Sequence, residues 1–364
     1  MLKLVCAALV SLMLALEPSA ASARPAHPHT VKKVKAQKAR AVVTRPGRGQ
    51  RRVAIVRGNR MIIHVRRGAP AMMAMTAMTA GDRAGLNQTR DPLALASSVA
   101  YVIDQASSQV LLDKNAGVAL PIASITKMMT GLIVVQSGLD LHEMLTITDA
   151  DVDRAKFSSS RLRVGARMTR GDLLHIALMS SENRAASALG RNYPGGLGAF
   201  VAAMNAKAHE LGMVDTHYVD SNGLSSQNVA SARDLARLAA VAYGEPLLRE
   251  FSTDPRYVVN DGQRAMQYAN TNYLVASPDW NIGLQKTGFI NEAGKCLLMQ
   301  AVIQGRNVIM VFLDSKGRQT RTADAGRVKK WLETQAVTTA TVPATTAPAM
   351  YRPASSADGV TQGG

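Results

Sequence analysis

Ser124 and Lys127 lie close together in the segment PIASITKMMT, which covers 121–130. Apolar residues recur there at helical spacing, at 125, 128, 129 and 132. Residues three positions apart share one face of a helix, so the serine hydroxyl and the lysine amine are expected to be neighbours. A serine becomes a nucleophile when a base takes its proton, and burial favours the neutral, basic form of a lysine. At a helix start its backbone N–H is also free to bind an oxyanion.

Taken alone, S-x-x-K is more often a helix cap beside a solvated lysine. Two further motifs change this interpretation. Ser181-x-Asn183 lies between two predicted helices, where both side chains can face a cleft, although Ser226-x-Asn228 matches the same bare pattern. Lys286-Thr287-Gly288 lies within a predicted strand, where an edge lysine and a turn glycine are the simpler explanation. The three motifs in this order, on a helix, an interhelical tip and a strand, indicate one catalytic centre.

The elements that must position these motifs follow a simple order. Strands are predicted at 97–104, 109–112, 282–288, 295–303 and 307–313, and helices at 169–179, 183–189, 197–211, 232–243 and 321–334. The two early strands and the three late ones can form one five-stranded antiparallel sheet. We therefore expect an α+β fold, with helices flanking the sheet, a mostly helical lobe, and a cleft between lobe and sheet edge.

The two ends of the chain are predicted to lie outside this body at 91–335. Residues 1–23 have the charged start, apolar stretch and Ala-Ser-Ala site of a secretory signal peptide, which predicts a periplasmic protein. Residues 24–90 are predicted to be a basic, mostly disordered arm with one possible hairpin, at 53–56 and 61–65. The last residues, 336–364, are Thr/Ala/Pro-rich and predicted to be disordered.

The basic arm accounts for most of the formal net charge of +17, because residues 24–81 hold 14 Lys/Arg and no Asp/Glu. This charge favours contact with anionic wall or membrane surfaces, with a solvated spacer as the alternative. Nucleic acid is not an expected partner of an exported chain that lacks a recognition motif. Cys6 leaves with the signal peptide, so Cys296 is expected to be a lone buried thiol.

The segments around the three motifs extend the pattern. They read PIASITK, ALMSSENRAA, YPGG, AMNAKA, LGM, ARDL, NTN, WNI and QKTGF. In these segments the chain resembles the serine D,D-peptidases of cell-wall metabolism. The strongest likeness is to low-molecular-mass penicillin-binding proteins of the D-alanyl-D-alanine endopeptidase class (penicillin-binding protein 7 type). It covers about residues 93–332 and implies a β-lactamase/transpeptidase-like fold.

The resemblance implies a role for each motif residue. Ser124 would be the nucleophile that forms an acyl-enzyme. Lys127 would be the general base, and the second cation, Lys286, would help to depress its pKa. Ser181 would pass a proton to the departing amine, and Asn183 would hold Lys127 and the peptide group of the substrate.

The resemblance also implies how the substrate is held. Lys286 and Thr287 would bind the carboxylate next to the scissile bond. Gly288 would leave room for the substrate to align along the strand edge. The backbone N–H groups of Ser124 and Phe289 would form the oxyanion hole. No metal or other cofactor is expected.

These roles imply a serine D,D-endopeptidase that hydrolyses D-alanyl cross-links between peptidoglycan stem peptides. β-Lactams would acylate the same serine, because the cation that binds the substrate carboxylate also accepts that of penicillin. A D-alanyl-D-alanine carboxypeptidase is the nearest alternative. Anchored carboxypeptidases of the family carry a second all-β domain and a C-terminal amphipathic helix, and the sequence predicts neither. A non-catalytic peptidoglycan-binding protein would leave the three motifs unexplained, and a monomer is expected.

Other hydrolase classes fit the sequence less well. A class A β-lactamase needs a glutamate for deacylation, and the segment RAASALGRNYPGG after Asn183 lacks E-x-x-L-N, so slow drug release is expected. A zinc peptidase helix fails on spacing, because His142-Glu143 is followed by Thr146 where the second histidine is required. No G-x-S-x-G elbow surrounds Ser124.

Overall fold

The computed structural model describes residues 53–57, 60–64, 78–317 and 319–340. The chain divides into two compact units, 1–74 and 75–364. In the first unit, β1 (Val53–Arg57) pairs antiparallel with β2 (Arg60–His64), which confirms the predicted hairpin. The predicted signal peptide, most of the basic arm and the tail from 341 lie outside the described residues. No helix among the described residues is long and apolar enough to cross a membrane.

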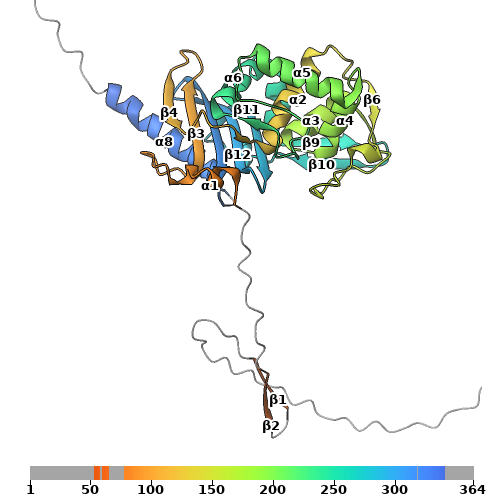
Figure 1. Ribbon diagram of the computed structural model, residues 1–364, viewed down its shortest axis with the longest axis horizontal. Coiled ribbons are helices and arrows are strands. Elements are labelled where there is room, and N and C mark those ends of the chain that lie inside the picture. Colours follow the sequence, from red (N-terminus) through yellow and green to blue (C-terminus); the bar gives the residue numbers. More distant parts are fainter. Residues whose placement is uncertain (1–52, 58–59, 65–77, 318, 341–364) are drawn as a thin grey trace, which may run out of the picture. The chain divides into compact units, whose positions relative to one another are not determined.

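A five-stranded antiparallel sheet forms the centre of the second unit, as predicted, in the order β11-β12-β13-β3-β4 (Figure 1). Its strands are β3 (Ser97–Asp104), β4 (Val110–Lys114), β11 (Asn281–Ile290), β12 (Gly294–Ile303) and β13 (Arg306–Ser315). The early hairpin joins the late strands where β3 pairs with β13, with Val102 opposite Met310. This order leaves β11, the strand with the K-T-G motif, at one edge of the sheet.

Both faces of the sheet are covered, which explains why the middle of each inner strand is rich in consecutive apolar residues. Side chains alternate between the faces, so Leu297 and Met299 of β12 pack with Val328 of α8 (Thr320–Ala340), whereas Leu298 joins the core of the helical lobe. Figure 1 shows α8 on one side of the sheet and the helical lobe on the other. Helix α8 continues to Ala340, beyond its predicted end at Thr334.

The helical lobe contains the predicted helices around a buried central one, α2. Its helices are α2 (Thr126–Gln136), α3 (Arg170–Met179), α4 (Asn183–Arg191), α5 (Gly196–Glu210), α6 (Ala232–Ala242) and α7 (Pro246–Thr253). The predicted cap of α3 is confirmed, because the Thr169 hydroxyl accepts a hydrogen bond from the Asp172 N–H at 3.0 Å. Helix α7 was not predicted; proline occupies its first turn, a favoured position.

Short elements connect the lobe and were mostly not predicted. The strand pairs are β5 (Leu120–Pro121) with β8 (Val229–Ala230), β6 (Met144–Thr146) with β7 (Arg167–Thr169), and β9 (Arg256–Asn260) with β10 (Ala265–Ala269). Single 3₁₀ turns are η1 (Leu86–Gln88), η2 (Ala123–Ile125), η3 (Asp149–Asp151) and η4 (Tyr273–Ala276). Strands of two or three residues carry too little period-two pattern to be identified from sequence.

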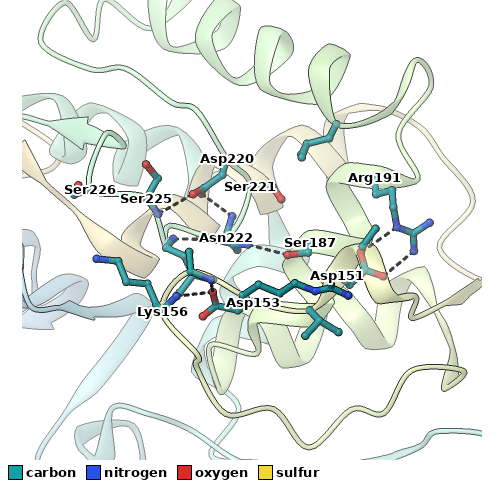
Figure 2. A pocket seen from close by; sticks show the side chains of 16 residues that line it. Asp151, Asp153, Lys156, Ser187, Arg191, Asp220, Ser221, Asn222, Ser225 and Ser226 are labelled. Carbon is teal, nitrogen blue, oxygen red and sulfur yellow. Dashed lines mark hydrogen bonds and ion pairs between the residues drawn. The ribbon is translucent and has the colours of Figure 1, made fainter.

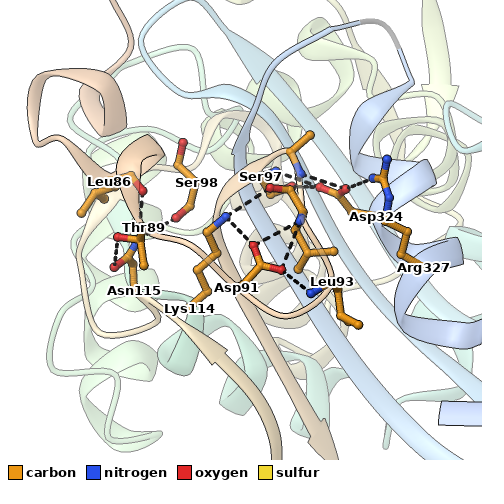
Figure 3. Close-up of polar contacts among 12 residues, drawn as sticks. Leu86, Thr89, Asp91, Leu93, Ser97, Ser98, Lys114, Asn115, Asp324 and Arg327 are labelled. Carbon is orange, nitrogen blue, oxygen red and sulfur yellow. Dashed lines mark hydrogen bonds and ion pairs between the residues drawn. The ribbon is translucent and has the colours of Figure 1, made fainter. Parts of the chain in front are cut away.

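The folded body begins before the predicted boundary at Asp91. Within 78–90, which the sequence assigns to the basic arm, α1 (Ala80–Arg83) packs on the body, and the Ala80 N–H donates to the Glu292 carbonyl at 2.8 Å. Figure 3 shows the next contacts along the chain. Asp91 forms an ion pair with Lys114 at 2.9 Å, and Asp324 of α8 accepts from the Ser97 N–H at 2.8 Å. These bonds fix the start of β3 against the sheet and α8.

Candidate active site

Ser124 lies in η2, and Lys127 lies in the first turn of α2, directly after it. The Lys127 Nζ donates to the Ser124 Oγ at 2.9 Å. The lysine side chain is fully buried, whereas the serine is partly exposed. The predicted neighbours are therefore in contact at the buried end of α2, with the hydroxyl open to an incoming molecule.

Two other segments also bind the Lys127 ammonium. It donates to the Asn183 Oδ1 at 2.8 Å and to the backbone carbonyl of Asn222. The amide group of Asn183 donates in turn to the Ser158 Oγ at 3.0 Å. Asn222 belongs to the D-S-N-G turn, which the sequence identifies only as a turn, because a backbone carbonyl leaves no signature in residue type.

Lys286 approaches the same tip from edge strand β11. Its Nζ donates to the Ser181 Oγ at 3.0 Å and to the Thr287 carbonyl at 2.8 Å, and its side chain is fully buried. Ser181 has a φ of +63°, an uncommon backbone conformation for a residue with a side chain. The serine and the asparagine of the S-x-N tip therefore each contact one lysine: Asn183 contacts Lys127 and Ser181 contacts Lys286.

Two glycines allow the backbone to pack tightly around Ser124. A Cβ on Gly288 of the K-T-G strand would lie 2.8 Å from the Ile122 carbonyl oxygen. A Cβ on Gly223 of the D-S-N-G turn would lie 2.1 Å from the Ala123 carbonyl oxygen, and its φ is +79°. Glycine at both positions lets the strand and the turn approach η2 from two directions.

The edge of β11 beyond the glycine is open and positively charged. The Phe289 side chain is 54% exposed. The Arg321 guanidinium of α8 donates to the Gly288 carbonyl at 2.8 Å and to the Cys296 carbonyl at 3.2 Å. Thr287 shares a hydrogen bond of 2.6 Å with the hydroxyl of Thr271. Arg321 was not identified from the sequence, since it belongs to no motif. Thr271 lies in the NTN segment of the resemblance, but no role was predicted for it.

The two buried lysines have strongly altered proton affinity. Burial lowers the pKa of Lys127 to about 7, and the carboxylates of Asp220 and Glu182 partly oppose that shift. Burial also lowers the pKa of Lys286 well below its usual value, and the charges of Lys127 and Arg321 lower it further. Burial, which the sequence predicted as a cause, is the main reason for the lowered pKa of Lys127, whereas the additional contribution predicted for Lys286 is not among its causes. A large share of Lys127 is therefore neutral at neutral pH.

The second S-x-N tripeptide, Ser226-Gln227-Asn228, stabilises the fold and does not take part in the catalytic contacts. Asn228 is fully buried, and its amide group donates to the Thr126 Oγ1 at 3.0 Å. Its side-chain Oδ1 accepts a hydrogen bond from the Val219 N–H at 2.7 Å. Asn228 thus supports the segment that carries Lys127 without contacting the lysine itself. Within 78–317 and 319–340, no group of three or more His, Cys, Asp or Glu side chains could hold a metal ion.

A cavity of about 750 Å³ lies beside the Asn222 turn (Figure 2). Its carboxylates are all engaged in other bonds. Asp151 forms an ion pair with Arg191 at 2.8 Å, and Asp153 accepts from the Ser158 N–H at 2.8 Å. Asp220 accepts from the Gly223 N–H at 2.6 Å. Each of these three carboxylates therefore helps to hold the local structure around the cavity.

Comparison with known proteins gives one family. Residues 86–317 match the peptidase S11 family, described as D-alanyl-D-alanine carboxypeptidase. A D-alanyl-D-alanine endopeptidase of Pseudomonas aeruginosa is 49% identical over 246 residues, which are 67% of this chain and 79% of the relative. A D-alanyl-D-alanine endopeptidase of Escherichia coli is 41% identical over 242 residues, 66% of this chain and 78% of the relative.

A solved structure supports the same relationship. The crystal structure of the Streptomyces K15 DD-transpeptidase is similar with a TM-score of 0.61 and 28% identity. The match covers 67% of this chain and 98% of that one. A D-alanyl-D-alanine carboxypeptidase of the same Streptomyces strain is 31% identical over 248 residues, 64% of this chain and 85% of the relative. The α+β fold with its five-stranded antiparallel sheet is thus the fold of this group.

Proposed function

The chain belongs to the peptidase S11 family of serine D-alanyl-D-alanine peptidases, and we propose that it cleaves D-alanyl cross-links with Ser124 as its nucleophile. One observation carries this assignment of roles. The Ser124 Oγ lies 2.9 Å from the Nζ of Lys127, a fully buried lysine whose pKa is lowered to about 7. A base of that pKa can accept the serine proton near neutral pH, and that proton transfer creates the attacking alkoxide.

The acylation step follows from this geometry. Neutral Lys127 takes the proton from the Ser124 Oγ as the oxygen attacks the carbonyl of the D-alanine. The backbone N–H groups of Ser124 and Phe289 stabilise the oxyanion that develops, and the close packing at Gly288 brings β11 near enough to contribute. Asn183 keeps the amine aligned by accepting its hydrogen bond at 2.8 Å.

The leaving amine requires a proton, and Ser181 is positioned to supply one. Its hydroxyl accepts from Lys286 at 3.0 Å, so Ser181 can donate to the amine and be reprotonated through Lys286. The carboxylate beside the scissile bond binds Thr287 and the cations Lys286 and Arg321. A bound carboxylate favours charged Lys286, and a charged Lys286 favours neutral Lys127, so substrate binding readies the base.

The proton that Lys127 took from Ser124 replaces the one that Lys286 gave up, which leaves Lys127 neutral. Lys127 then acts as base again: it takes a proton from the water that attacks the acyl-enzyme and returns it to the Ser124 Oγ as the ester bond breaks. Benzylpenicillin leaves a bulkier acyl group on Ser124. The segment after Asn183 lacks the E-x-x-L-N glutamate that activates a deacylating water in class A β-lactamases. We therefore expect β-lactams to be released slowly, so that the enzyme behaves as a penicillin-binding protein.

Endopeptidase activity is the favoured specificity within this family. The relatives that are 49% and 41% identical are both named D-alanyl-D-alanine endopeptidase, whereas the Streptomyces relative at 31% is named a carboxypeptidase. The cross-linked stem peptides of peptidoglycan are the corresponding substrate. Residues 1–23 are a candidate export signal to the periplasm, where the basic residues of the arm would favour anionic wall or membrane surfaces.

The test is to supply the chain from Arg24 with a cross-linked muropeptide dimer and, separately, a monomeric pentapeptide. Mass spectrometry of the products distinguishes the two activities. The proposal expects the dimer to be split into monomers, and a Ser124→Ala variant to leave it intact. Loss of only the terminal D-alanine from the pentapeptide would instead establish the carboxypeptidase.

A further inference from the structure

The loop at 153–158 lies next to the S-x-N tip of the catalytic centre and is held in a defined shape. The Asp153 carboxylate accepts from the backbone N–H groups of Ala155, Lys156 and Ser158 at 3.0, 2.9 and 2.8 Å. Ser158 accepts the hydrogen bond from Asn183, so the end of the loop is attached to the S-x-N tip. The loop thus belongs to the helical-lobe side of the catalytic centre.

The same loop reaches the sheet side of the catalytic centre through Lys156. Its ammonium forms an ion pair with the carboxylate of Glu292, in the turn between β11 and β12. Glu292 is itself anchored, because its backbone carbonyl accepts from Ala80 of α1. The ion pair therefore connects the loop attached to Asn183 with the turn that follows the K-T-G strand, just beyond Phe289.

This connection matters for the shape of the substrate. A peptide that aligns along the β11 edge runs towards the turn that contains Glu292. A small acylating agent ends before that turn. A cross-linked stem peptide continues, and in the wall both of its ends are attached to glycan strands, so it cannot be threaded endwise beneath a closed bridge.

We propose that the Lys156–Glu292 ion pair is a clasp across the cleft that must open to admit cross-linked peptide sideways and need not open for small acylating agents. The inference rests on the proposed endopeptidase function and adds a specificity-determining device to it. Both side chains are about one third exposed, at 33% and 31%. Water competes well for an ion pair this exposed, so the clasp can open at little cost and close again over the bound chain.

The decisive experiment locks the clasp. In a Lys156→Cys/Glu292→Cys variant of the chain from Arg24, the two new thiols are joined by a short bismaleimide. Cys296 is fully buried and Cys6 precedes Arg24, so the reagent is directed to the two introduced positions. Two single-cysteine variants, treated identically, control for modification without cross-linking.

Two rates are measured on the locked enzyme: acylation by a fluorescent penicillin, and release of cross-links from purified sacculi. We expect sacculus cleavage to fall about 10-fold or more, equivalent to at least about 1.4 kcal/mol of barrier, while acylation stays within about 2-fold. The acylation rate also verifies that the locked enzyme is folded. Equal cleavage of sacculi by locked and unlocked enzyme, with normal acylation, would overturn the clasp alone.

A charge exchange gives an independent readout. Lys156→Met, which opens the clasp, is expected to raise the ratio of sacculus cleavage to acylation, and Lys156→Glu combined with Glu292→Lys to restore the wild-type ratio. A ratio that stays constant through this series would contradict the proposal. If the wild-type chain is acylated normally by the penicillin but cleaves no sacculi, the proposed endopeptidase function is wrong, and the clasp proposal is wrong with it.

Discussion

The two S-x-N tripeptides hold the Ser124–Lys127 segment from two sides and do so for different purposes. At the tip between α3 and α4, Asn183 accepts from the Lys127 ammonium at 2.8 Å. In the turn before β8, Asn228 binds Thr126 through its amide group at 3.0 Å. The first therefore contacts the reacting amine, and the second contacts only the scaffold beside it.

Their surroundings differ as much as their partners. Ser181 and Asn183 are partly exposed, and the backbone of Ser181 has a φ of +63°. Asn228 is fully buried and accepts from the N–H groups of both Val219 and Asp220. Backbone strain and exposure are expected where a side chain must contact substrate, whereas burial and complete hydrogen bonding are typical of a residue that stabilises the fold. The same S-x-N pattern thus serves the catalytic site at 181–183 and the stability of the fold at 226–228, because the two tripeptides lie in different surroundings.

The largest expected difference is between the two serines. Ser181→Ala removes the proton path to the leaving amine and should lower the rate of dimer cleavage by about 10²-fold or more. Ser226→Ala, the matched control, should leave that rate and the melting temperature unchanged. Steady-state cleavage of the muropeptide dimer measures both variants. A rate loss of similar size in the two would remove the distinction between the regions.

The two asparagines are expected to separate activity from stability. Asn228→Ala leaves several buried polar groups unpaired and should lower the free energy of unfolding by about 2–4 kcal/mol. Asn183→Ala, at a partly exposed position, should cost much less stability but should slow acylation strongly. Denaturant unfolding and penicillin acylation of the folded fraction test the pair. A larger loss of stability in Asn183→Ala, or a larger loss of acylation rate in Asn228→Ala, would contradict the comparison.

The smallest expected effect concerns Glu182 and Gln227, the middle residues of the two S-x-N tripeptides. Lys127 must be neutral to act, so acylation should rise with pH through its pKa of about 7. The Glu182 carboxylate raises that pKa, so Glu182→Gln should shift the rise to lower pH. The exposed Gln227 is the control position, and Gln227→Glu should shift the rise less. A pH profile of the acylation rate measures the shifts, and an unmoved profile in Glu182→Gln would contradict this electrostatic link.

Much of the fold could be predicted because its elements are long and regular. The three inner strands of the sheet carry long apolar runs, and α3 has a Thr cap that marks its start. Helix α7 and the short strand pairs were missed, since they gain their order from packing rather than from a local pattern. The boundary at Asp91 was placed too late because α1 has four residues and depends on its contact with Glu292.

The candidate site divides in the same way. Side chains in motifs could be identified, and the structure brings Ser124, Lys127, Ser181, Asn183 and Lys286 together through hydrogen bonds. The carbonyl of Asn222 and the guanidinium of Arg321 could not be identified, because the first acts through its backbone and the second comes from the last helix. Contacts between distant segments require the three-dimensional fold.

The central claim is that Ser124, activated by Lys127, is the residue that becomes acylated. Its most direct test is the mass of the chain from Arg24 after reaction with benzylpenicillin, followed by peptide mapping of the adduct. We predict one covalent adduct, located on Ser124 and absent from Ser124→Ala. An adduct on another residue, or one that persists in Ser124→Ala, would contradict the account.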